Sequence, residues 1–86
     1  MTAPEALRAA LPGASLSPVV CQPEHALATV YGVAYILLQL PSGCWLATIS
    51  IEDQPQTGAI EHGPEEALVR ARRQWMDMIH AQQAAA

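Results

Sequence analysis

The stretch VAYILLQLPSGCWLATISI, residues 33–51, determines the fold that we expect for this chain. Two runs rich in leucine, β-branched and aromatic side chains flank Pro41-Ser42-Gly43. Proline suits the second position of a type I turn, and glycine suits the left-handed residue that follows it. The pattern therefore predicts a β-hairpin with strands at 33–40 and 44–52, in which Leu40 pairs with Cys44.

This register determines which side chains share a face of the hairpin. The first face carries Val33, Tyr35 and Leu37 beside Ile51, Ile49 and Ala47, with Gln39 and Trp45 at the turn end. The second face is also apolar, although a sheet face in water normally alternates with polar residues. We therefore expect the second face to be covered by the N-terminal helix or by a second copy of the chain. Its apolar residues are Ile36, Leu38, Leu40 and Leu46.

Helix signals lie on both sides of the hairpin. Thr2 and Glu5 have the spacing of a capping box, and Pro12-Gly13 stops the segment, which predicts a short helix over 3–11. Gly63-Pro64 followed by two glutamates begins a longer helix over 64–82. Its apolar stripe is Leu68, Ala71, Trp75, Met78 and Ile79. We expect Trp75 to meet Tyr35, Ile49 and Ile51 in the core.

The remaining segments are less regular. Residues 19–21 lie between two prolines and are compatible with a short edge strand. Residues 23–31 fit either a helix or a strand, with strand slightly favoured, and 59–61 fit a short further strand. At 86 residues, we expect a single α+β domain over 1–86: an antiparallel sheet of three to four strands, centred on the hairpin and packed by the C-terminal helix.

The charge balance argues against nucleic-acid binding. The chain has 8 acidic and 4 basic residues, no lysine and a net charge of −4. Phosphate contacts come mainly from lysine and arginine, so the cluster of Arg70, Arg72 and Arg73 makes a nucleic-acid accessory protein only the alternative reading. The order helix, strands, helix is similar to that of double-stranded-RNA-binding domains. Those modules present lysines near the start of the last helix, where this chain has Pro64-Glu65-Glu66, so RNA binding is not expected.

Catalytic and metal motifs are weak. Glu65 and Glu66 lie in the first turn of the predicted helix, where its dipole favours carboxylates. The pairs Glu66–Arg70 and Arg73–Asp77 have the i,i+4 spacing of salt bridges on a helix. We expect free thiols, no catalytic residue and no cofactor. The third alternative is a small metal-binding domain, whose zinc ligands would come from an ill-spaced set of cysteines and histidines. This set is Cys21, His25, Cys44 and either His62 or His80.

These observations favour a non-enzymatic protein-protein interaction module that binds and modulates a larger protein or complex. Inhibition is one concrete form, as in phage-encoded and other bacterial accessory proteins. The expected partner contacts are Arg70, Arg72, Arg73, His62 and Met76. The second face of the hairpin is expected to serve a homodimer or a partner. We expect a cytoplasmic protein with free thiols, because Cys21 and Cys44 lie far apart without a CxxC motif and the first twelve residues do not resemble a secretory signal. No transmembrane segment is predicted, because the apolar run 26–40 is shorter than the roughly 20 residues of a membrane span.

Overall fold

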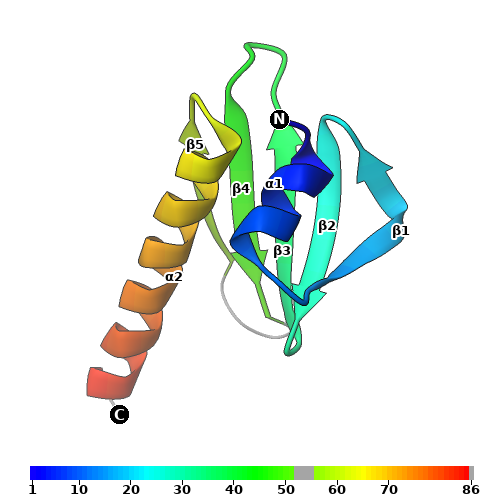
Figure 1. Ribbon diagram of the computed structural model, residues 1–86. Helices are drawn as coiled ribbons and strands as arrows, with labels where there is room; N and C mark the ends of the chain where they lie inside the picture. Colours follow the sequence, from blue (N-terminus) through cyan, green and yellow to red (C-terminus); the bar gives the residue numbers. More distant parts are fainter. Residues whose placement is uncertain (52–55, 86) are drawn as a thin grey trace.

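The structure, a computed structural model, describes residues 1–51 and 56–85 and has an α+β fold (Figure 1). Five strands form one antiparallel meander in the order β1-β2-β3-β4-β5, so the prediction of three to four strands was too low. The end of the predicted strand 44–52 lies outside the described residues. The elements are α1 (Ala3–Ala10), β1 (Ser15–Gln22), β2 (His25–Val30), β3 (Val33–Gln39), β4 (Trp45–Ser50), β5 (Thr57–Glu61) and α2 (Pro64–Ala85).

The central hairpin is confirmed in its register. Tyr35 pairs with Ile49 and Leu38 with Leu46, as the turn sequence predicts. At the turn, the Leu40 amide donates a hydrogen bond of 2.7 Å to the Cys44 carbonyl. Gly43 has a φ of 93°, the left-handed conformation for which glycine is suited.

The first two strands account for the error in strand number. β1 spans eight residues and contains Pro18, which was predicted to bound the strand. β1 lies at the edge of the sheet, and its pairing with β2 shifts register between Leu16 and Cys21, so Pro18 interrupts no regular ladder. The strand reading of residues 23–31 is confirmed over 25–30. Tyr31-Gly32 then forms a tight turn before β3, which the sequence pattern did not predict.

Both helices begin with the predicted signals. The Thr2 hydroxyl accepts from the Glu5 amide, and the Glu5 carboxylate accepts from the Thr2 amide and hydroxyl. These hydrogen bonds to Thr2 lower the pKa of the Glu5 carboxyl group. At the start of α2, the Gly63 carbonyl accepts from the Ala67 amide, as an N-cap residue does. α1 ends at residue 10 and α2 at residue 85, against the predicted 11 and 82.

The core lies between the sheet and the two helices. Figure 1 shows α1 and α2 on the same side of the sheet, and residues of both helices share one buried cluster with the strands. Alanines line much of this boundary, which lets the helices approach the sheet closely. They are Ala3, Ala6, Ala26, Ala28, Ala47, Ala59, Ala67 and Ala71.

The largest fully buried side chains are Leu7, Leu37 and Ile49. Trp75 and Ile51 are partly buried against the same core, which also contains Tyr35 and Ile49; direct contact of Trp75 with these residues stays a prediction. Because α1 packs on the side that carries Leu37 and Ile49, it does not cover the second face of the hairpin. The prediction that the N-terminal helix could cover that face was therefore wrong.

Candidate protein-interaction surface

The sheet face turned away from the helices is organised in rows that cross the strands. In antiparallel pairs, residues opposite each other place their side chains on the same face. The first row runs across four strands through His25, Leu38, Leu46 and Ile60. All four side chains are large, and we call this row the ridge.

Two further rows follow along the strands. The middle row consists of Leu27, Ile36, Thr48 and Gly58. The last row consists of Thr29, Ala34 and Ser50, which are all small, and we call it the hollow. The ridge, the middle row and the hollow together form the open face. Its relief therefore falls from large side chains near the Pro41-Ser42-Gly43 turn to small ones at the opposite end of the strands.

The open face is less buried than the core face and is uncharged. Leu37 on the core face is 0% exposed, whereas its neighbours Ile36 and Leu38 are half-buried and Ile60 is 55% exposed. None of the residues in the three rows is Asp, Glu, Lys or Arg. By contrast, the two helices carry charged residues along their length: Glu5, Arg8, Glu65, Glu66, Arg70, Arg72, Arg73 and Asp77.

Most of the predicted second face belongs to this surface. Ile36, Leu38 and Leu46 lie on the open face in the expected register, and Leu40 follows β3 as a half-buried residue at its margin. Leu27 and Ile60 were missed. A signal was present for Leu27, because Ala26-Leu27-Ala28-Thr29 alternates in size, but residues 23–31 fit a helix as well as a strand, so no face was assigned to them.

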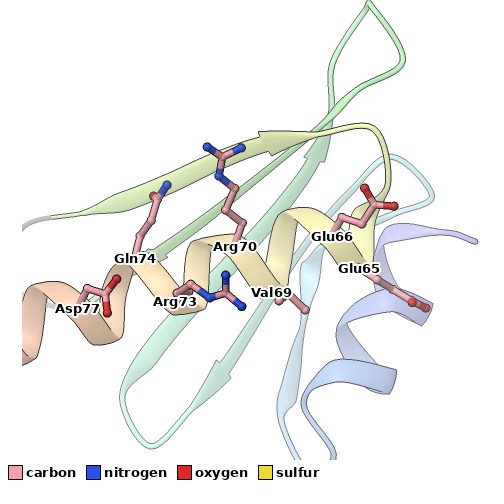
Figure 2. A pocket seen from close by; sticks show the side chains of 7 residues that line it. All are labelled: Glu65, Glu66, Val69, Arg70, Arg73, Gln74 and Asp77. Atoms are coloured by element: carbon pink, nitrogen blue, oxygen red, sulfur yellow. The ribbon is translucent and has the colours of Figure 1, made fainter.

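The three predicted arginines are exposed, but their side chains do not point toward one common site. Arg70 forms an ion pair with Glu61 of β5, rather than with Glu66 as the i,i+4 spacing predicted. Figure 2 shows Arg70 extending toward β5, whereas Arg73 points away from that strand. Both line a shallow groove on the outer side of α2 together with Glu65, Glu66, Val69, Gln74 and Asp77.

This groove mixes three acidic residues with two arginines, so it lacks the positive potential that a phosphate site needs. Its lining comes from α2 alone, which makes it the space between long side chains of one helix. Arg72 and Met76 are also exposed on α2, Met76 to 48%.

The cysteines and histidines only partly come together. The Cys44 Sγ atom lies 3.8 Å from His62 Nδ1 at the margin of the open face, and His62 is exposed. Cys21 pairs with Ala26 of the core side, whereas His25 belongs to the ridge, so this predicted pair of ligands is split between two faces. Among residues 1–51 and 56–85, no group of three or more His, Cys, Asp or Glu residues is placed to hold a metal ion. Both cysteines are free thiols.

The fold and the surface define a small α+β protein with a meander sheet that has helices on one face. Comparison of the chain with protein-family models, with curated proteins and with solved structures found no match. In the described part of the chain, no helix is long and apolar enough to cross a membrane.

Proposed function

We propose that this protein is a non-enzymatic interaction module that binds a protein partner through the open face. The observation that carries the proposal is the one-sided fold: both helices pack on one face of the sheet, and the other face carries Leu38, Leu46 and Ile60 without a charged neighbour in its rows. Antiparallel sheets that face water alternate apolar and polar residues, and open apolar patches mark contact sites.

The dimensions of the open face suit a protein rather than a small ligand. Five strands about 4.8 Å apart, each about 20 Å long, give a surface of roughly 20 Å by 20 Å. The surface has an apolar centre at Leu38 and Leu46, with Thr29, Ser50 and His25 toward its edges. An apolar centre with a polar rim is the usual composition of protein interfaces.

The module acts in the cytoplasm, where free thiols such as Cys21 and Cys44 stay reduced. It modulates the larger protein that it binds, and inhibition through occupation of a contact surface is the simplest outcome. The exposed Arg72 and Met76 lie on the helix layer, so a partner seated on the open face would not touch them.

Two matched substitutions test this proposal. Ile60 is 55% exposed on the open face and Val69 is 60% exposed on α2, so each accepts glutamate with little change in folding. Affinity capture from lysate of the native host is expected to recover the same partner with wild type and Val69→Glu, but not with Ile60→Glu. Equal recovery with both variants, each shown to be folded by circular dichroism, would exclude the open face as the binding surface.

A further inference from the structure

We propose that the partner on the open face is a second copy of this chain, packed face to face so that the ridge of each copy lies in the hollow of the other. This inference rests on the proposed function because it uses the same open face, and it assigns a second copy of the chain, rather than a larger protein, as the occupant of that face. The assembly is a symmetric dimer with the four helices outside and two five-stranded sheets inside.

The charge distribution favours a copy over a foreign partner. A two-fold interface brings each surface against an identical surface, so any charged side chain near the axis would face a like charge from the other copy. The open face carries no Asp, Glu, Lys or Arg in its three rows, although the chain has a net charge of −4. A surface that selects a foreign protein normally uses charges to steer and discriminate, and this face has none to use. Two copies also have the same sheet twist, which is the condition for aligned face-to-face packing.

The difference in side-chain size between the ridge and the hollow favours one of two possible orientations of the two-fold axis. A two-fold axis between facing sheets runs either along the strands or across them. An axis along the strands places ridge against ridge and hollow against hollow. Sheets pack about 10 Å apart at near-crystalline density, so that arrangement overfills one end and leaves a void at the other. An axis across the strands, over the middle row, places each ridge above the other copy's hollow.

This second arrangement makes definite pairs. Along β3, Leu38 of one copy lies over Ala34 of the other, and the two Ile36 side chains meet near the axis. Along β4, Leu46 lies over Ser50 of the other copy. The pairs follow from the rows, because Leu38 and Ala34 stand two residues on either side of Ile36. Large and small side chains therefore alternate across the interface, as in well-packed cores.

The area is sufficient for a reversible dimer. A face of roughly 20 Å by 20 Å on each copy buries on the order of 1,000 Å² in total, once side-chain relief is included. Specific interfaces begin at about this size. An interface at this lower limit is expected to have a dissociation constant on the order of micromolar.

Sedimentation velocity of the full chain between about 1 and 200 µM tests self-association over this range. Wild type and Val69→Glu are expected to shift from monomer to dimer together. Ile60→Glu is expected to weaken dimerisation at least about 100-fold, because it buries an unpaired carboxylate beside an apolar surface.

A double-mutant cycle tests the ridge-in-hollow pairing. Ala34→Leu fills the hollow opposite Leu38 and is expected to weaken dimerisation at least about tenfold. Leu38→Ala alone weakens it by removing the ridge side chain. The combination Ala34→Leu/Leu38→Ala restores the pair with its members exchanged and is expected to return to within about threefold of wild type. The pair Ser50→Leu and Leu46→Ala provides the same cycle on β4, should a β3 variant fail to fold.

Each other outcome overturns the inference. Wild type that stays monomeric at the highest concentration excludes the dimer, and a dimer insensitive to Ile60→Glu uses another surface. A tighter dimer with Ala34→Leu would mean that hollow meets hollow, which contradicts the proposed axis. The proposed function survives a monomeric result if lysate capture still separates Ile60→Glu from Val69→Glu. Both proposals fail if the chain is monomeric and capture does not distinguish the two variants.

Discussion

Replacing Tyr31 by asparagine should stabilise the protein. Tyr31 and Gly32 are the two central residues of the hairpin between β2 and β3, and their φ angles are 50° and 77°. Positive φ at both positions defines a type I′ turn, for which Asn-Gly is the preferred sequence. An ordinary side chain in the left-handed region costs roughly 1 kcal/mol, and asparagine tolerates that region better than tyrosine.

The magnitude can be isolated because the Tyr31 side chain is 100% exposed, so its removal loses no packing. Tyr31→Asn should therefore increase the free energy of unfolding by about 0.5 to 1 kcal/mol. For a domain of this size, 1 kcal/mol corresponds to a rise in Tm of about 4 to 8 °C.

Urea unfolding at one protein concentration measures the effect as a shift in midpoint with unchanged slope. Tyr31→Ala is the control, because it removes the phenol ring but keeps a side chain that disfavours positive φ. It should stay within about 0.5 kcal/mol of wild type. The reasoning would be refuted if Tyr31→Asn gave no gain, or if Tyr31→Ala gave an equal one.

Three further changes probe the core, the first helix and the surface. Ile49→Ala should lower the free energy of unfolding by about 3 kcal/mol in urea titrations, because Ile49 is fully buried and its truncation leaves a cavity. Thr2→Val should lower Tm at pH 7 by breaking the capping box. The Glu5 pKa is lowered in the folded state, so its contribution is present above the ordinary carboxyl range and is lost as the pH falls through the lowered value. The Tm difference between wild type and Thr2→Val should therefore narrow in acid, and a constant difference would contradict this. Arg70→Gln should change stability by less than about 1 kcal/mol at any salt concentration, because the ion pair with Glu61 is exposed to water.

The sequence predicts the turn of one hairpin much better than that of the other. Pro41-Ser42-Gly43 is a typical turn sequence, so the pairing of Tyr35 with Ile49 was predicted correctly. Tyr31-Gly32 makes a tighter turn with an unfavourable first residue, so sequence signals did not separate β2 from β3. The pairing of Val30 with Val33 and the rest of the sheet stabilise the unfavourable backbone conformation of Tyr31. Local residue propensities do not include these contacts.

The candidate surface was predicted only in part, because a local sequence pattern does not report the tertiary contacts around it. The hairpin pattern alone placed Ile36, Leu38 and Leu46 together on one apolar face and predicted a cover for it. Whether α1 covers that face depends on the side of the sheet on which the chain places α1 before Pro12-Gly13. Hydrophobic periodicity does not predict this side. The arginines were predicted as a cluster from spacing along one helix, but the nearest carboxylate to Arg70 came from β5.

The meander has a consequence for how the chain folds. Every strand pairs with the next one along the sequence, so the sheet can grow hairpin by hairpin with short loop closures. Such local topologies fold faster than sheets with distant pairings. Helix α2, which covers β4 and β5, follows all five strands along the sequence. Before α2 docks, the core side of β4 and β5 lacks its cover while the ridge is open on the other side, so we expect a folding stage with apolar surface on both faces of the sheet. That stage, rather than the finished fold, is where this protein is most exposed to aggregation.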